Sequence, residues 1–319
     1  MMSSVGRENR NTSSESQTPP CLACLSQQTR AVFRLDSSRF FRCSECRTLF
    51  CQPRRVPVDL CEYHQADAAY LYNRYYDGLR TAQAQEVIRG LRAVLPPPLR
   101  LIDIGCGNGL FVAKASEAGY SCRGIDTSLP PREACHLPEH LSQRSATEEA
   151  ESGAMYDIVS VLNVLEHIPD PDGFLRVVTR LLRPGGILVC SMPLSSGLIY
   201  GLCEWLYRVT GGSAVIPLKT VLQWHMAAPH VFLPTIGGIR QLMRRHFGSL
   251  PEGISSQRIV DVRNLSSRIA LERKQRHVTA WENVVLSCGG LALGILGAIA
   301  SRLRKPDEVF FFVRRTTDG

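Results

Sequence analysis

Short apolar runs and stretches of helical periodicity alternate through the middle of the chain. The apolar runs at 101–104, 120–126, 156–162 and 187–192 predict buried strands, and the stretch at 110–118 predicts a helix. Strands that alternate with helices along a chain are typical of a domain with a parallel sheet. The pattern therefore predicts an α/β fold.

The same pattern continues on both sides of this region. Apolar residues at helical spacing predict helices at 81–95, 174–182 and 235–247, and the prolines at 96–98 end the first of these. The run EVFFFVRR at 308–315 predicts a last strand, which we expect at the edge of the sheet. The core of the domain therefore extends almost to the end of the chain.

Three glycines follow the first strand at alternate positions, in the sequence LIDIGCGNGL. The strand contains Asp103, and Gly105, Gly107 and Gly109 precede the helix. Glycine allows the backbone to pass close to a ligand where a Cβ atom would collide with it. A dinucleotide-binding turn places its third glycine three residues after the second, whereas here the interval is two. The spacing therefore favours another ligand.

The D-x-G-x-G-x-G stretch resembles motif I of the class I S-adenosylmethionine (SAM) methyltransferases. This resemblance implies that the glycine turn wraps the methionine end of SAM and that Asp103 helps to hold it. The runs LEHIPDP and LLRPGGILV are similar to the central part of methyltransferases of the ubiquinone-biosynthesis type, and the likeness extends from about 101 to 193. It implies a Rossmann-like sheet of seven strands.

Polar residues at the ends of the next two strands complete the expected site. Asp126 matches the family's ribose-binding acid, since an ionised carboxylate accepts hydrogen bonds from both ribose hydroxyls. Asn163 follows the third strand, where ligands of open α/β sheets bind, and we expect it to contact the cofactor. His167 is a candidate general base, unless it only packs the loop. Related quinone-biosynthesis enzymes carry E-x-x-E-H here, so Glu166 and His167 could hold a divalent ion, although Asn163 replaces the first glutamate.

The chain has 12 cysteines, and four of them form two C-x-x-C pairs near its beginning. Cys21, Cys24, Cys43 and Cys46 have the ligand spacing of a structural zinc ribbon, in which four thiolates close a tetrahedral site. Reduced thiols without metal are the alternative. The first residues show no signal peptide, so we expect a reducing, cytoplasmic location, where paired cysteines bind metal more often than they form disulfides.

We expect a disordered tail at 1–19, a zinc ribbon at 20–65 and a SAM methyltransferase domain at 66–319. By similarity to the family, the apolar and aromatic insertion at 195–234 should form a lid over the acceptor, and its His225 and His230 are further base candidates. The uncharged segment at 284–300 is shorter than the usual ~20 residues of a bilayer span. A buried helix or peripheral membrane contact remains, and we expect the second.

The predicted function is SAM-dependent methyl transfer to the oxygen or nitrogen of a small molecule. The apolar lid favours an apolar or amphiphilic acceptor. The net charge of +8 is spread along the chain, and it permits a nucleic-acid partner without requiring one. An RNA methyltransferase that contacts nucleic acid through the ribbon is therefore an alternative. A SAM-fold protein without activity is another, which the intact glycines and Asp126 disfavour. The expected cofactors are SAM and a structural zinc ion.

Overall fold

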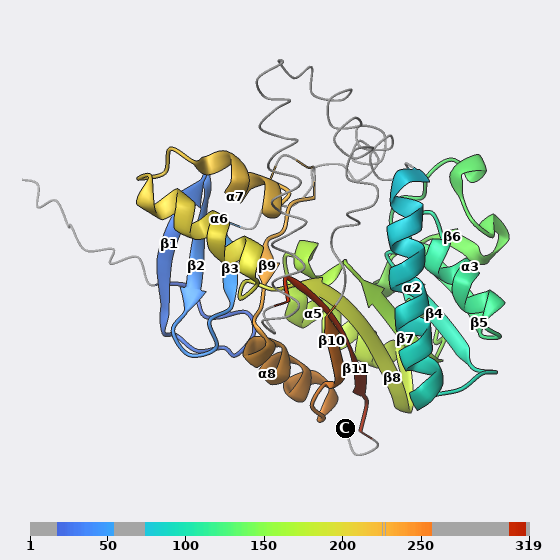
Figure 1. Ribbon diagram of the computed structural model, residues 1–319. Helices are drawn as coiled ribbons and strands as arrows, with labels where there is room; N and C mark the ends of the chain where they lie inside the picture. The colour runs from blue at the N-terminus through green and yellow to red at the C-terminus, as the bar shows by residue number, and fades with distance from the viewer. Residues whose placement is uncertain (1–17, 54–73, 225, 227, 257–305, 317–319) are drawn as a thin grey trace, which may run out of the picture.

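The computed structural model describes residues 18–53, 74–224, 226, 228–256 and 306–316. Within these ranges the chain forms a seven-stranded sheet and a separate four-stranded sheet, which lie side by side (Figure 1). The apolar segment at 284–300, nearly all of the tail and the end of the expected ribbon at 54–65 lie outside the described residues.

The larger sheet confirms the predicted α/β fold. Its order is β10-β11-β8-β7-β4-β5-β6, and the strands from β8 to β6 are parallel, whereas β11 and β10 are antiparallel to their neighbours. The strands span Arg100–Ile104 (β4), Ser121–Asp126 (β5), Leu141–Gln143 (β6), Tyr156–Leu162 (β7), Leu182–Pro193 (β8), Glu252–Ser256 (β10) and Glu308–Arg314 (β11).

The prediction that the last strand lies at the edge of the sheet is wrong. β11 lies between β8 and β10, and β10 forms the edge. β10 has the sequence EGISS, in which Ile254 is the one apolar side chain apart from a glycine and the other four residues are exposed, so its own sequence carries little hydrophobic signal. It becomes a strand because β11 offers it an unpaired row of backbone groups.

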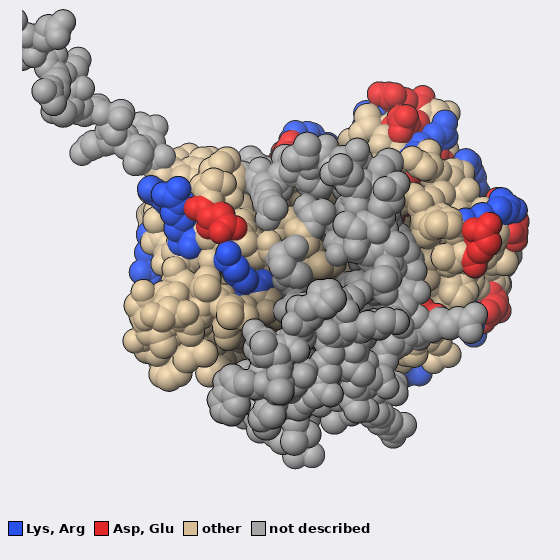
Figure 2. Space-filling view, turned by 90° about the horizontal axis from the view of Figure 1, so that it is seen from above, with Lys and Arg blue, Asp and Glu red and all other residues tan. Residues whose placement is uncertain are grey.

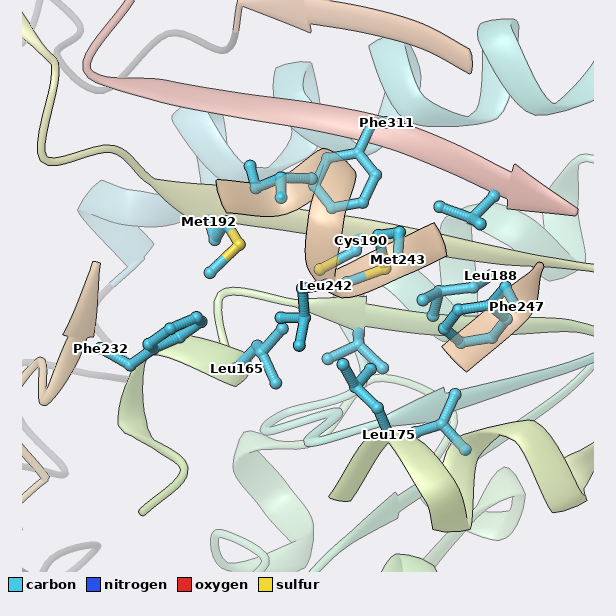
Figure 3. Packing of buried hydrophobic residues seen from close by; sticks show 14 of the residues in the cluster. Leu165, Leu175, Leu188, Cys190, Met192, Phe232, Leu242, Met243, Phe247 and Phe311 are labelled. Atoms are coloured by element: carbon cyan, nitrogen blue, oxygen red, sulfur yellow. The ribbon is translucent and has the colours of Figure 1, made fainter. Parts of the chain in front are cut away.

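Helices cover both faces of this sheet. α2 (Arg74–Val94) and α3 (Leu110–Glu117) pack on one face, and α5 (Pro171–Leu181) and α8 (Ile236–Phe247) pack on the other, together with the short α4 (Ala146–Glu151). Side chains of a strand alternate between its faces, so Phe310 and Phe312 join the α2 side, whereas Phe311 joins the other (Figure 3). α2 begins at Arg74, before the expected residue 81. The sequence did not indicate this earlier start, because Asp77 and Gly78 interrupt the apolar periodicity.

The smaller sheet joins the predicted ribbon to the predicted lid. β1 (Thr29–Leu35), β2 (Ser38–Cys43) and β3 (Leu49–Gln52) form an antiparallel meander, and β9 (Phe232–Leu233) from the insertion pairs with β3. α6 (Leu198–Val209) and α7 (Val215–Val221) pack against one face of this sheet. The helix in the first half of the insertion was expected, whereas α7 and β9 were not.

Candidate functional site

The glycine turn connects β4 to α3 at the carboxyl edge of the large sheet. Gly105, Gly107 and Gly109 have φ values of +73°, +53° and +77°, which L side chains rarely adopt. The backbone N–H groups of Gly105 and Cys106 donate to the carbonyl of Ile125 on β5, at 2.8 and 3.1 Å. The turn is therefore fixed to the end of the neighbouring strand.

The space around the three glycines differs. A Cβ atom on Gly105 would lie 2.4 Å from a methyl group of Val164, and one on Gly109 would lie 2.6 Å from the carbonyl oxygen of His136. A Cβ atom on Gly107 would meet no atom of the described residues within 4 Å. The outer glycines are thus required by the packing of the protein itself, whereas the middle one borders open space.

Asp126 lies directly beside this open position. Its Oδ2 accepts a hydrogen bond from the Gly107 N–H at 2.9 Å, and its Oδ1 accepts one from the Ser128 N–H at 3.1 Å. Two backbone donors therefore orient the carboxylate before any ligand arrives. The sequence-predicted glycines and ribose acid are brought together in one place.

Asp103 lies within β4, just before the glycine turn. Its side chain is buried and accepts a hydrogen bond from the Ser160 hydroxyl on β7 at 2.7 Å. Burial raises the pKa of Asp103 to about 7, the hydrogen bond from Ser160 opposes this rise, and the charge of Asp126 adds to it. A carboxyl group with such a pKa is sensitive to any positive charge placed nearby.

Asn163 is held by the sheet on both sides. It has a φ of +54°, and its side-chain amide donates to Glu308 at 2.8 Å and accepts from the Ser191 hydroxyl at 2.8 Å. These contacts join the end of β7 to β8 and β11. The expected contact of Asn163 with the cofactor stays a prediction, and within the structure its side chain ties the strand ends together.

A cluster of three titratable side chains lies beyond Asn163, where the insertion at 195–234 meets the core. Glu166 and His167 belong to the 3-10 turn Leu165–His167, and His230 comes from the insertion. One ligand atom of each lies within 4.8 Å of the others, and the two imidazole rings are 4.9 Å apart. His225, the other histidine considered, lies outside the described residues.

Two polar atoms of this cluster have no hydrogen-bond partner among the described residues: Oε2 of Glu166 and Nδ1 of His230. Burial raises the pKa of Glu166 to about 8 and lowers that of His167 to about 4, where the carbonyl of Pro229 partly opposes the shift. Buried polar groups are usually paired, so the two unpaired atoms mark a place for a ligand, a proton or a cation.

Sequence reasoning did not place Glu308 beside Asn163, and it considered His230 only as a separate base candidate, not beside Glu166 and His167. Glu308 begins β11 and is buried beside Asn163, and burial raises its pKa to about 7. No local pattern marks either residue, because a single acid before an apolar strand and a single histidine in an insertion are common. Their shared position depends on pairing between distant segments.

The four predicted zinc ligands converge at the end of the small sheet. Sγ of Cys21 lies 3.5 Å from Sγ of Cys46, Sγ of Cys24 lies 3.5 Å from Sγ of Cys43, and all four lie within 4.8 Å of one another. A tetrahedral site with Zn–S bonds of about 2.3 Å requires sulfur atoms about 3.8 Å apart. The hydrogen bond from Cys21 is the main cause that lowers the pKa of Cys46, to about 5. The cluster therefore fits a metal ion of zinc size.

Comparison with known proteins agrees with this architecture. The profile of the methyltransferase domain family matches residues 74–248, which is more than half of the 319 residues. The chain belongs to the methyltransferase domain family. The match covers the glycine turn, Asp126, the Glu166–His167 pair and the insertion at 195–234, and it begins after the cysteine pairs.

Curated relatives match a shorter central region. The ubiquinone biosynthesis O-methyltransferase of Cereibacter sphaeroides (strain ATCC 17025) is 36% identical over 139 residues, which cover 39% of this chain and 56% of that protein. The protein of the same name from Escherichia coli (strain IAI39) is 26% identical over 125 residues, which cover 37% and 50%. The chain thus spans about half the length of the curated relatives that it matches.

One solved structure shares the fold at low identity. A chain of the complex between the Haloferax volcanii Trm112 methyltransferase activator and a chain described as a methyltransferase matches with a TM-score of 0.50 and 16% identity. The match covers 81% of this chain and 98% of that one.

Proposed function

We propose that the protein is a SAM-dependent methyltransferase. The observation that carries this proposal is the open space at Gly107 beside a carboxylate that two backbone N–H groups hold in place. Membership of the methyltransferase domain family supports it. The residues present fit the cofactor, because Gly107 is the glycine of the turn whose Cβ position meets no described atom within 4 Å, so its backbone is open to a ligand beside Asp126.

In this proposal each residue of the turn has a separate task. Asp126 accepts the ribose hydroxyls, and Gly107 lets the cofactor approach the backbone. Asp103 supplies a negative charge below the methionine end. Bound SAM would supply an activated methyl group on its sulfonium sulfur, with S-adenosylhomocysteine as the leaving group. The protein contributes mainly by holding the two reactants in position and by excluding water.

The acceptor side is assigned to the cluster of Glu166, His167 and His230. His167 is neutral near pH 7, because its pKa is lowered to about 4, so it can accept a hydrogen bond but is a weak base. Glu166 has a pKa near the operating range, which suits proton transfer. We propose that Glu166 takes up the proton that leaves the acceptor, that His167 accepts a hydrogen bond beside it, and that His230 lies next to both from the lid.

A divalent cation is the second use of this cluster that the unpaired Oε2 and Nδ1 atoms favour. Cobalt titration distinguishes cation binding at this cluster from proton transfer. Cobalt bound by thiolates gives intense charge-transfer bands, whereas cobalt bound by imidazole and carboxylate groups does not. If the cluster works by proton transfer alone, about one cobalt ion binds per chain, at the four cysteines. A second equivalent that disappears in His230→Gln would assign the cation.

We propose a small apolar or amphiphilic acceptor, methylated on oxygen or nitrogen. The ubiquinone biosynthesis relatives and the apolar lid, with Trp224 and Tyr200 in its core, support this class. Among the described atoms of the face shown in Figure 2, Lys and Arg lie in separate groups with acidic residues between them. The described atoms of that face form no continuous basic surface, which nucleic-acid binding would favour.

Calorimetry with SAM tests the proposal. Asp126→Ala should weaken SAM binding by about 1–2 kcal/mol, because a charged hydrogen-bond acceptor is lost. Asp157→Ala is the matched control: it removes an aspartate at the opposite end of β7, where Asp157 pairs with Arg183, and should leave the affinity unchanged. Wild-type affinity in Asp126→Ala would contradict the assignment.

The acceptor class is tested with labelled SAM and fractionated cell extract. We expect label in the lipid or small-molecule fraction. Label in the RNA fraction, removed by raised salt, would favour the RNA reading instead.

A further inference from the structure

We propose that the centre formed by Cys21, Cys24, Cys43 and Cys46 anchors the lid at 195–234. Metal in this centre would then hold the acceptor half of the active site and leave the cofactor half unaffected. The inference rests on the methyltransferase function proposed above and assigns a control element to its acceptor side.

The first observation is that the lid contributes a strand to the ribbon's sheet. Leu49 and Phe50 of β3 pair with Leu233 and Phe232 of β9, and the Cys51 N–H donates to the carbonyl of Val231 at 3.1 Å. A two-residue strand has no stability of its own. Pairing with β3 therefore helps to hold β9 in its position.

The second observation is that ribbon and lid share polar contacts and a core. Arg42 of β2 forms an ion pair with Glu204 of α6 at 2.5 Å, and both side chains are about nine-tenths buried. Asp36, in the β1–β2 turn, accepts a hydrogen bond from the indole of Trp224 at 2.7 Å and pairs with Lys219 of α7. Apolar residues of the sheet, α6 and α7 form one cluster. If the ribbon separated from the lid, Glu204 would lose a buried partner.

The third observation places the cysteine turns at the point where the lid returns to the core. The Thr235 hydroxyl donates to the carbonyl of Cys46 at 2.6 Å and accepts from the Gly238 N–H, which caps α8. Arg245 of α8 donates to the carbonyl of Ala23, between Cys21 and Cys24, at 2.7 Å. The backbone at each cysteine pair thus accepts a hydrogen bond from α8 or its N-cap, which follow directly after the lid.

These contacts decide where His230 lies. It directly precedes the residues that pair with β3, and the Val231 N–H donates to the carbonyl of Glu166 at 2.8 Å. The Phe232 side chain enters the core cluster of the large sheet, near Leu165 (Figure 3). β9 is therefore held between the ribbon and the Glu166–His167 turn, and it carries His230 to that turn.

Metal loading should control this arrangement because the ribbon is small. The part of the ribbon that the structure describes ends at residue 53. Domains below about 40 residues rarely fold without disulfides or metal, and the binding energy of a structural metal is then folding energy. Loss of the metal should release β3, and with it β9 and the lid. The glycine turn is bonded instead to Ile125 and Asp126 of β5, in the large sheet, and should keep its shape.

Hydrogen exchange on the full chain tests the proposal. Zinc-loaded and reduced, chelator-treated samples are compared by mass spectrometry, and the affinity for S-adenosylhomocysteine is measured on the same samples. We expect exchange in α6, α7 and β9 to rise at least about tenfold after metal removal, since local opening becomes far more frequent. The S-adenosylhomocysteine affinity should change by less than about twofold, because its contacts lie in the large sheet.

Two matched variants separate the metal from general damage to the ribbon. Cys24→Ala removes a ligand and should behave like the chelated protein, whereas Cys51→Ala changes a buried cysteine of β3 outside the cluster and should keep metal and lid protection. Asp36→Ala keeps all four ligands, and should change Trp224 fluorescence and loosen α7 alone.

Unchanged lid protection in the metal-free protein, failure to take up zinc, or loss of cofactor binding together with the lid would each overturn the inference. Failure of the zinc-loaded protein to bind S-adenosylhomocysteine would instead contradict the proposed function, and the exchange result would still stand.

Discussion

At the scale of single residues, Asp103 combines full burial with a position below the proposed methionine site. Its pKa is raised from 3.8 to about 7 by burial, so the free protein carries this carboxyl partly protonated at neutral pH. The positive sulfonium and ammonium groups of SAM favour the ionised form. Binding should therefore release a proton.

We expect SAM affinity to rise with pH between about 5 and 7, and to level off above that range, since each unit of pKa shift corresponds to about 1.4 kcal/mol. Calorimetry in buffers of different ionisation enthalpy measures the number of protons released, and Asp103→Asn should abolish this release.

Because the folded pKa is raised, the contribution of Asp103 to stability is present below pH 4 and is lost as pH rises through 7. Asp103→Asn should thus unfold at higher denaturant than the wild type at pH 8, and equal stability there would contradict the burial argument.

Gly107 and Gly105 provide a matched pair of substitutions in one turn. Both have positive φ, but a Cβ atom on Gly105 would overlap a methyl group of Val164, whereas one on Gly107 would meet no atom of the part of the chain that the structure describes. Gly105→Ala should lower the free energy of unfolding by several kcal/mol, from steric overlap and strain together. Gly107→Ala should lower it by about 1 kcal/mol from strain alone and should still prevent SAM binding. Urea unfolding and calorimetry measure the two effects, and normal SAM binding by Gly107→Ala would place the ligand elsewhere.

At the scale of elements, the base of β7 is held to α4 by a buried carboxylate. Tyr156 donates to Glu149 at 2.5 Å, and Arg144 pairs with the same carboxylate at 2.8 Å. Burial raises the pKa of Glu149, but the hydrogen bonds from Tyr156 and Arg144 outweigh it and hold this pKa below its usual value. The ionised carboxylate thus stabilises the junction of α4, β5 and β7.

Tyr156→Phe should lower the free energy of unfolding by about 1.5–3 kcal/mol at pH 7, the range for a hydrogen bond to a charged group. Because the folded pKa of Glu149 is lowered, this contribution is lost as pH falls below 4, and the difference between variant and wild type should shrink there. Tyr120→Phe is the control: its hydroxyl donates to the neutral carbonyl of Leu95, so a smaller effect without that pH dependence is expected. Equal losses in the two variants would show that the charge of Glu149 contributes little.

At the scale of the whole molecule, the described residues contain no helix of sufficient length and apolar character to cross a bilayer. The segment 284–300 lies outside these residues, and its peripheral contact with membrane stays a prediction. We expect the full chain to float with anionic liposomes and a variant with 284–300 replaced by a polar linker to stay at the bottom of the gradient, because apolar burial and basic residues act together. Sedimentation of both proteins would leave only the buried-helix reading.

Local features of the sequence determined the cofactor half of the protein. The strand, glycine turn and helix around Asp103 are encoded in adjacent residues, by apolar runs and by glycines that positive φ requires. Parallel strands bring their carboxyl ends to one edge, so Asp126 could be placed beside the turn without a structure. The two C-x-x-C pairs also identified each other, because metal geometry restricts their spacing.

Only the tertiary structure decided the region that we propose binds the acceptor. β9 and β10 are short strands whose own composition predicts nothing, and each forms because another strand, β3 or β11, presents free backbone groups. The meeting of His230 with Glu166 and His167 follows from that pairing. Such contacts join segments far apart in the chain, and their free energy depends on the shape of both partners, which no local pattern of residues contains.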